Sequence, residues 1–456
     1  MVRLLKNCMS CLSDKLRLMK ILTLAIPASV EYLFQTAVGF VDTVFVAKLG
    51  LTEVAAVGIT NTIMDAYIAI FMAVGVGASS LIAQSIGGNN HRKASEIARQ
   101  ATILAFLIGI LFGVLTFFLA NPLLRIMGAE PKVLADGTIY FHIVGINSVF
   151  ISLMFVLGSI LRGSGNTLMP MKISIWINII HVGLDYFFIF GFGNMAGLGV
   201  QGAAWATVIS RLLGMSALFI AVMKSNIKFS LFKGGILSNW IITKELVMLS
   251  LPTAIERLLM RTGQIFYIGL IISMGTFTYA AHIIAGNIET LVFMPAYGLA
   301  IAATTLVGQS IGAKRIDEAY NYGLLTAVVG ILIMACVSIL IFCLCPWFAS
   351  WFTAEKNVID LVVIALKIDA FSLPALTLTF VLSGALQGAG DTKTPMYSTV
   401  VGMWLIRVVG VYLLGIHWHM GIAGVYLSAA VDMILRAIFL SFKFKKHIVI
   451  CRNRTE

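Results

Sequence analysis

The stretch AIPASVEYLFQTAVGFVDTVFVAKLG, residues 25–50, is long and apolar enough to cross a lipid bilayer, yet it contains Glu31 and Asp42. Together with Gln35 and Gly39, these acids are spaced by four, four and three residues, so a helix places all of them along one face. A charged side chain in the middle of a bilayer costs several kcal/mol, so this face must contact protein or water rather than lipid. The stretch therefore predicts a membrane helix with one polar, inward-facing stripe.

The rest of the chain has the composition of an integral membrane protein. Of its 456 residues, 59% are hydrophobic and only 11% are charged, whereas soluble domains carry about 25% charged residues. The apolar runs have the length of membrane helices, not the alternating pattern of barrel strands. We therefore expect an all-α membrane protein with twelve transmembrane helices. The runs lie at residues 20–46, 53–82, 98–120, 137–160, 170–191, 201–222, 246–272, 279–306, 322–345, 360–386, 396–416 and 422–442.

The chain repeats itself at a constant offset in residue number. Pro27 and Glu31 recur as Pro252 and Glu256. The same offset pairs AQSIG (83–87) with GQSIG (308–312) and LRGSGNTLMPM (161–171) with LQGAGDTKTPM (386–396). Near the end of each copy, GVQGAAWAT (from 199) matches GIAGVYLS (from 421) at an offset shortened to 222. The sequence is thus a tandem duplication of a six-helix unit.

Because six is an even number, both copies enter the membrane from the same side. We therefore expect two six-helix bundles related by a pseudo-twofold axis along the membrane normal, with a cleft between them. The predicted lobes are residues 1–230 and 231–456, joined by a basic linker at about 224–245.

The net charge of +12 is distributed as in a multi-pass membrane protein. Most Lys and Arg residues lie at the two ends and in the even-numbered connections. The odd-numbered connections and the helix ends beside them hold only Lys48, Arg125, Lys132, Lys356 and Lys367. This positive-inside asymmetry predicts that both termini are cytoplasmic, and it argues against a nucleic-acid partner.

The basic start of the chain runs straight into the first span with no small-residue cleavage site, so we do not expect a signal peptide. Cys8 and Cys11 form half of a zinc motif with no second pair, so we expect no metal site there.

A second polar stripe lies on the repeat-related helix. Glu256, Met260, Gln264 and Tyr267 have the spacing of the first stripe, and Tyr267 takes the place of Asp42. We assign Glu31 and these four residues to a substrate cleft. Pro27 and Pro252 each remove a backbone hydrogen bond one turn before the repeated Glu, so they are predicted hinges, the alternative being an inherited kink without motion.

A third stripe occupies the fifth span, SIWINIIHVGLDYFFIFG. Asn178, His181 and Asp185 lie on one face of it. We predict that they share a proton or cation site with Asp42, to which Tyr140 and Thr207 contribute neutral oxygens. The alternative is a hydrogen-bonded pair of His181 and Asp185 that only locks helices together.

These motifs in this order resemble the multidrug and toxic compound extrusion (MATE) transporters: IPASVEYLFQTAVGFVDTVFVAKLG, AQSIGGNNHRKA, LRGSGNTLMPM, GLDYFFIFG and GVQGAAWAT. The resemblance covers essentially the whole chain. It implies twelve helices in two lobes and export of amphipathic, often cationic compounds in exchange for H⁺ or Na⁺. Under this resemblance Asp42 and Gln35 match family residues of the first helix, Tyr140 one of the fourth, Asp185 the fifth-helix Asp of DinF-like and archaeal members, and Thr207 the sixth-helix Thr.

Two departures refine the resemblance. His181 stands where those members carry Asn, and an imidazole is a poor Na⁺ ligand but a good proton carrier. Met260 and Leu376 stand where the NorM-like branch has acids, so the chain resembles the DinF-like and archaeal branch more closely than NorM.

The sequence thus predicts a monomeric, cation-coupled multidrug antiporter of the plasma membrane that works by alternating access, with H⁺ favoured over Na⁺ and no cofactor or enzymatic activity. One rival is a flippase for lipid-linked precursors of the same superfamily. Another is an intramembrane hydrolase that uses His181 and Asp185, which the absence of a matching nucleophile or metal set disfavours. A channel is disfavoured because the carboxylates occur singly.

Overall fold

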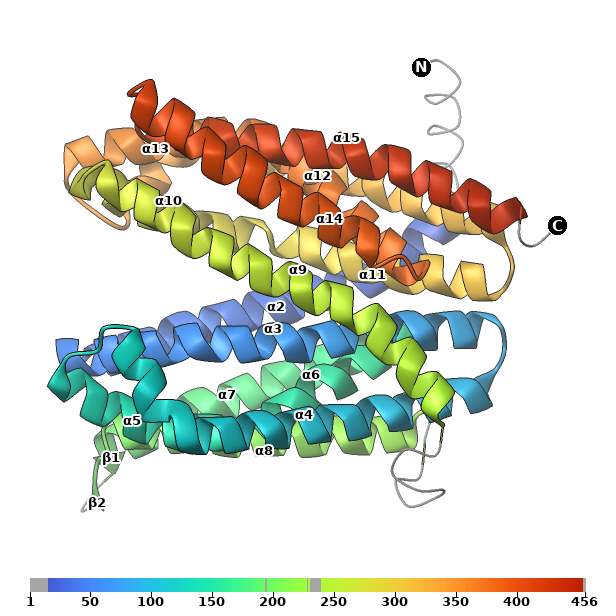
Figure 1. Cartoon of the computed structure of the whole chain (residues 1–456), viewed down its shortest axis with the longest axis horizontal. Coiled ribbons are helices and arrows are strands. Elements are labelled where there is room, and N and C mark those ends of the chain that lie inside the picture. The colour runs from blue at the N-terminus through green and yellow to red at the C-terminus, as the bar shows by residue number, and fades with distance from the viewer. Residues whose placement is uncertain (1–14, 193–194, 228, 230–238, 454–456) are drawn as a thin grey trace. The chain divides into compact units, whose positions relative to one another are not determined.

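The computed structural model describes residues 15–192, 195–227, 229 and 239–453, which fold almost entirely into helices (Figure 1). Cys8, Cys11 and the middle of the predicted linker 224–245 lie outside the described residues.

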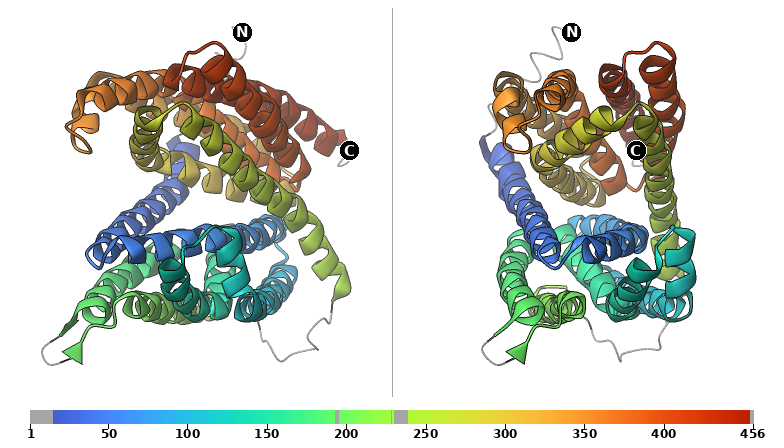
Figure 2. Two further views of the ribbon diagram at one scale, coloured as in Figure 1. Left: turned by 60° about the vertical axis from the view of Figure 1, so that its left-hand side comes forward. Right: turned by 90° about the vertical axis from the view of Figure 1, so that its left-hand side faces the viewer.

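The helices of the first half of the chain are α2 (Lys15–Ala47), α3 (Leu51–Gly87), α4 (His91–Ile126), α5 (Pro131–Ile146), α6 (Ser148–Gly163), α7 (Leu168–Phe190) and α8 (Val200–Lys224). Those of the second half are α9 (Trp240–Ser273), α10 (Thr276–Val292), α11 (Met294–Gly312), α12 (Ile316–Ser350), α13 (Lys356–Gly388), α14 (Lys393–Val401), the π-helical turns η1 (Gly402–Val408) and η2 (Val411–His417), and α15 (Ile422–Asn453). A two-stranded antiparallel hairpin, β1 (Gly191–Phe192) and β2 (Met195–Ala196), follows α7 (Figure 2).

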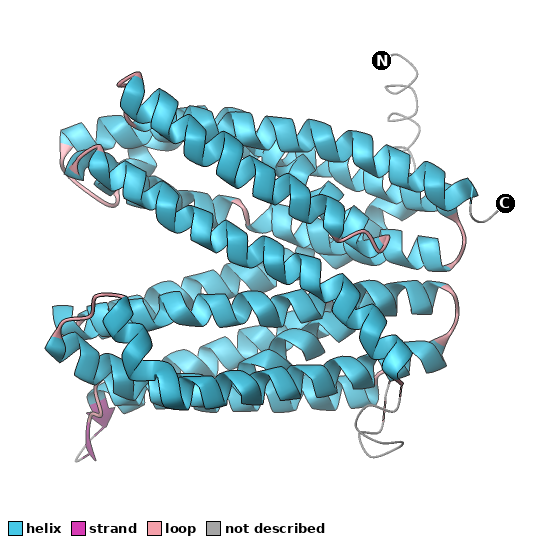
Figure 3. Cartoon of the chain, in the orientation of Figure 1, coloured by secondary structure: helices cyan, strands magenta, loops and turns pink. Residues whose placement is uncertain are grey.

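Each predicted apolar run coincides with one helix, one continuous series of helical turns or one bent pair of helices. Helices make up nearly all of the described chain (Figure 3). Within the described residues, nine helical segments are by themselves long and apolar enough to cross a membrane, and α5 with α6 and α10 with α11 form two further spans bent by 47° and 42°. The remaining run, 246–272, lies in α9, which is long enough but carries three charged residues close together, Glu256, Arg257 and Arg261.

The two bends have local causes. Between α5 and α6, the side chain of Asn147 donates to the carbonyl oxygen of Ile143 at 2.8 Å and so competes with the helical hydrogen bonds. Pro295, at the start of α11, cannot donate a backbone hydrogen bond to the helix before it.

The chain divides into two compact units. Unit 2 holds Val30–Ser85 and Asn90–Ala254, and unit 1 holds the chain up to Ser29, Ile86–Asn89 and everything from Ile255 onward. Helix α2 changes unit after Ser29 and α9 changes unit after Ala254, and these two positions are equivalent in the repeat. The predicted lobes, residues 1–230 and 231–456, are defined by the sequence repeat and not by the packing of these two units. The division into these lobes stays a prediction.

The core of unit 2 combines aromatic packing with a few satisfied hydroxyl groups. Phe71 and Phe141 are fully buried, and Tyr67 packs on Phe112 with ring centroids 4.3 Å apart. The hydroxyl of Thr116 lies within hydrogen-bond distance of that of Tyr67, at 3.3 Å, so the tyrosine oxygen is not left without a partner inside the bundle.

Unit 1 buries a charge cluster between η1 and α15. Asp432 is fully buried, and both its oxygens accept from Arg436, at 2.6 and 2.8 Å. Nε of Arg407 lies 3.2 Å from the same carboxylate. A side chain at Gly402 would collide with Arg436 and Asp432, so the glycine makes room for this ion pair.

Equivalent helix crossings in the two copies depend on close approach. A Cβ added to Gly163 of α6 would lie 2.6 Å from the carbonyl oxygen of Ser79 in α3, and one added to Gly388 of α13 would collide with the backbone of Thr304 in α11. Gly388 and Thr304 are the repeat equivalents of Gly163 and Ser79. The duplicated sequence therefore preserves one packing contact in each unit.

The outer faces of the helices are apolar. On α4, Phe106, Leu107, Ile110 and Leu111 are exposed at helical spacing. Such a stripe is unfavourable in water and is expected where helices meet lipid.

We expect Gly163→Ala to destabilise the protein by about 1–3 kcal/mol, because the added methyl group must push α3 and α6 apart. Thermal unfolding of the purified protein in detergent measures the effect. Gly58→Ala in α3 is the matched control, since a Cβ there meets no atom within 4 Å. Equal unfolding temperatures for the two variants would contradict the assigned contact.

Candidate functional site

Unit 2 encloses a cavity of about 340 Å³ among its helices. Its walls come from α2, α3, α5, α6, α7 and α8. The seven residues predicted to form the coupling site all line it: Asp42, Asp185, His181, Gln35, Tyr140, Thr207 and Asn178. The fold thus gathers residues from four predicted spans in one place, while their role in coupling stays a prediction.

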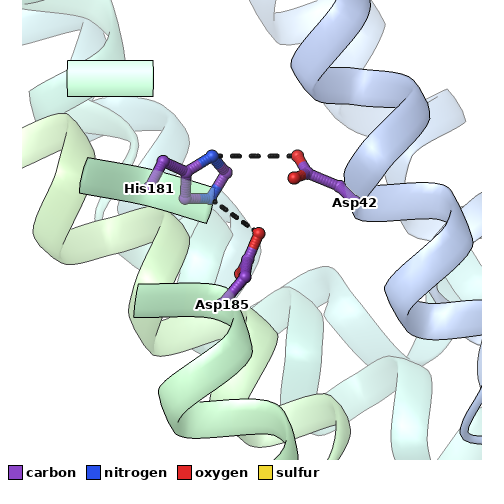
Figure 4. Close-up of side chains that lie close together, drawn as sticks. All are labelled: Asp42, His181 and Asp185. Carbon is purple, nitrogen blue, oxygen red and sulfur yellow. Dashed lines mark ion pairs between the residues drawn. The ribbon is translucent and has the colours of Figure 1, made fainter. Parts of the chain in front are cut away.

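Three ionisable side chains meet at the centre of this site (Figure 4). His181 lies between the two acids, with Nδ1 3.8 Å from Oδ2 of Asp42 and Nε2 3.5 Å from Oδ2 of Asp185. Asp185 is almost fully buried, whereas the side chain of Asp42 is 34% exposed. One ligand atom from each of the three lies within 4.8 Å of the others, so they can share one proton or one small cation.

Thr207 favours hydrogen on Nε2 of His181 in the neutral ring. The threonine hydroxyl donates to the carbonyl oxygen of Ala203 at 2.9 Å, so its oxygen is free to accept from Nε2, 3.5 Å away. Asp185 is a second acceptor beside the same nitrogen. When the neutral ring carries its hydrogen on Nε2, the lone pair of Nδ1 points towards the carboxylate of Asp42, and this contact is repulsive. Binding of one further proton between the two groups converts the contact into a hydrogen bond.

Two of the predicted neighbours of this cluster, Tyr140 and Asn178, are polar but uncharged, whereas Arg211, which lines the same cavity, is charged. Tyr140 is buried and interacts electrostatically with Asp42, and the side-chain nitrogen of Asn178 donates to the hydroxyl of Ser174 at 3.4 Å. The Oδ1 atom of Asp42 is buried and has no hydrogen-bond partner within the described part of the chain. The site therefore retains an acceptor for a proton or another donor.

Glu31 lines the same cavity but forms an ion pair that the sequence does not reveal. Its Oε1 accepts from Nη1 of Arg162 at 3.0 Å, and Nη2 of the arginine donates to Ser159 at 3.2 Å. Both charged side chains are largely buried. The partners are 131 residues apart, and Arg162 follows the predicted run 137–160, so no local pattern connects them.

The other four predicted cleft residues belong to unit 1. Glu256 accepts from the hydroxyl of Thr399 at 2.7 Å, and Gln264 accepts from Arg261 at 3.3 Å. Tyr267 is buried in the core of that unit, and Met260 is partly buried. Their assignment to a substrate cleft stays a prediction.

Pro27 and Pro252 lie inside continuous helices, α2 and α9. Helix α2 passes from one unit to the other after Ser29, and α9 does so after Ala254. Each proline lies two residues before that point. The assignment of both prolines as hinges stays a prediction.

A multi-pass helical protein with a cavity lined by ionisable side chains among its membrane spans has the architecture of a membrane transporter. The chain belongs to the MatE family, whose model matches residues 27–187 and 252–413. The two matches begin at the repeat-equivalent prolines, Pro27 and Pro252. This is a family of transporters, so the predictions of a transporter and of no enzymatic activity are confirmed.

Two relatives show how far the similarity extends. The chain is 30% identical to a probable multidrug resistance protein NorM of Thermotoga maritima, over 96% of this chain and 95% of the relative. It is 27% identical to the multidrug resistance protein PmpM of Pseudomonas aeruginosa, over 94% of this chain and 91% of the relative. The preference for the DinF-like branch over NorM stays a prediction.

Solved structures share the fold. A multidrug resistance MATE transporter of the MOP superfamily, in an outward-facing conformation, superposes with a TM-score of 0.88 at 24% identity, over 95% of this chain and 96% of that one. A MATE protein in complex with MaL6 gives 0.89 at 24% identity, over 95% and 97%. The prediction of an all-α membrane fold with twelve transmembrane helices in two bundles is thereby confirmed.

We expect Arg162→Met to destabilise the protein by about 3–5 kcal/mol, because it leaves the buried carboxylate of Glu31 without its counter-charge. Thermal unfolding in detergent measures the loss, with Arg125→Met, at an exposed position, as the control. The double variant Glu31→Gln with Arg162→Met should unfold at a higher temperature than Arg162→Met alone. A single variant as stable as the wild type would show that the pair has no structural role.

Proposed function

We propose that this protein is a proton-coupled multidrug exporter that exchanges amphipathic, often cationic compounds for H⁺ by alternating access. It acts as a monomer in the plasma membrane, with both termini in the cytoplasm. The export of drugs is supported by relatives named as multidrug resistance proteins over nearly their whole length. Asp42, His181 and Asp185 bind the coupling proton.

The observation that carries proton coupling is the position of His181 between two carboxylates. Both ring nitrogens face an acidic oxygen, and the lone pair at Nδ1 leaves room for one more proton beside Asp42. An Na⁺ ion prefers oxygen ligands, so an imidazole at the centre of the site favours H⁺. Binding of this proton would neutralise the polar face of α2 and favour bending of the helix near Pro27.

The available driving force is adequate. One elementary charge that crosses a membrane potential of 100 mV releases about 2.3 kcal/mol. Exchange of one proton for a neutral compound moves one net charge and could therefore maintain roughly a fiftyfold concentration ratio of substrate. Exchange of one proton for a monocation moves no net charge, so the pH gradient drives it.

Asp42→Asn should abolish the export of ethidium from vesicles in which a pH gradient has been imposed, because the amide cannot gain or release the coupling proton. Dye fluorescence gives the rate, and the same vesicles with only an Na⁺ gradient should show no export by the wild type. Normal export by Asp42→Asn would disprove the role of Asp42, and export driven by Na⁺ alone would overturn the choice of proton.

His181→Asn should weaken the dependence on the pH gradient and introduce a dependence on Na⁺, because an amide oxygen replaces the imidazole beside the two acids. Ethidium export is measured with each gradient imposed separately. Asn61→Ala, which alters a wall of the same cavity on α3, serves as the control. If the variant retains the ion dependence of the wild type, His181 does not select the ion.

A flippase for lipid-linked precursors is the second candidate. Two arginines, Arg162 and Arg211, line the cavity, and a guanidinium group is a good ligand for phosphate. A solved transporter of the MOP superfamily from Pyrococcus furiosus, for which the reversed polarity of the binding pocket suggests a different function, gives a TM-score of 0.87 at 24% identity, over 95% of this chain and 96% of that one. The fold is therefore compatible with more than one substrate. Loss of a lipid-linked glycan in a deletion strain, with unchanged drug sensitivity, would favour this candidate.

A further inference from the structure

Arg211 is a charged residue of the cavity that the coupling mechanism does not use. It lies on α8 four residues after Thr207 and therefore on the same face of the helix. Its guanidinium lines the cavity and interacts electrostatically with Asp42 and Tyr140. Its Nη1 atom is buried and has no hydrogen-bond partner among the residues that the structure describes.

A purely structural role would look different. Arg436, which is structural in unit 1, makes two hydrogen bonds to the carboxylate of Asp432, and Arg162 makes one to Glu31. At the repeat offset of 222, Arg211 corresponds to Met433, which packs in a small apolar cluster. The second copy thus fills this position with an apolar side chain, and only the first copy places a charge there.

The charges of the cavity do not cancel. Glu31 and Arg162 neutralise each other as an ion pair. With His181 neutral, two carboxylates, Asp42 and Asp185, then share the cavity with the guanidinium of Arg211. One negative charge remains, and an unbalanced charge is costly in a low-dielectric interior. A single monovalent cation or a single proton restores neutrality, whereas a dication leaves the cavity positive.

We propose that Arg211 limits the cavity to one positive charge at a time, so that it accepts either one proton or one monocationic substrate and discriminates against dications. This inference rests on the proposed function, because it assigns a charge class to the substrate of the same site. Arg211 acts as a built-in cation that satisfies one of the two carboxylates. Replacing it with an uncharged side chain creates room for a second positive charge.

Ethidium and propidium test the proposal because they share a phenanthridinium ring but carry one and two positive charges. Binding of each dye to the purified full-length protein is measured by fluorescence anisotropy, and export is measured in vesicles with a pH gradient. The wild type should bind ethidium roughly tenfold or more tightly than propidium, which corresponds to about 1.4 kcal/mol. Arg211→Met should lose most of this preference by gaining affinity for propidium.

Two variants keep the outcome interpretable. Arg211→Lys retains the positive charge and should retain the preference for ethidium. Loss of the preference in this variant would show that the shape of the side chain, not its charge, sets the selectivity, and would overturn the inference. Arg125→Met removes a positive charge of unit 2 from an exposed position outside the cavity and should leave the preference unchanged.

The failure of this inference can be distinguished from the failure of the proposed function. If the wild type exports ethidium but Arg211→Met keeps the full preference for the monocation, Arg211 does not set the charge capacity and the drug-export function stands. If the wild type binds both dyes equally, the inference is likewise overturned. If the wild type neither binds nor exports ethidium, the proposed function and the inference both fail. If Arg211→Met does not fold, Arg211→Gln takes its place, and a preference unchanged in that variant overturns the inference.

Discussion

Balancing charge inside an apolar bundle is the constraint that shapes the polar parts of both units. A lone ionised group among membrane helices is costly, so each buried charge needs a partner, a proton or contact with water. Asp432 meets this requirement with Arg436 and Arg407, and Glu31 meets it with Arg162. The cluster around His181 meets it only in part, and that incomplete balance is what makes it suitable for exchanging a cation.

The internal duplication separates scaffold from function. Both copies retain the close crossing at Gly163 and Gly388, because a backbone contact of this kind tolerates no larger residue. The copies differ where the cavity is charged, since Asp42 is replaced by Tyr267 at the equivalent position. Packing thus explains why the glycine at the helix crossing is the same in both copies. The charge of the cavity in unit 2 explains why the copies differ at Asp42 and Tyr267.

Much of the site could be predicted from helical periodicity. The stripes on α2 and α7 follow from spacing alone, so the pairing of Asp42 with Asp185 and His181 could be proposed before any coordinates. The Glu31–Arg162 pair could not, because its members are far apart in sequence and Arg162 looks like a charge at a loop. Nη1 of Arg211 has no hydrogen-bond partner among the described residues, and the sequence could not predict this either, since it depends on what surrounds the side chain.

The amino-acid sequence was enough to establish the membrane class, the number of spans, the repeat and the polar faces, because hydrophobicity and helical spacing are local properties that survive any arrangement of the helices. Which polar faces share a cavity, which charges cancel and which remain were settled in three dimensions alone. Those outcomes depend on distances between side chains of different helices, such as the 3.8 Å between His181 and Asp42. Packing sets such distances, and no pattern along one helix encodes them.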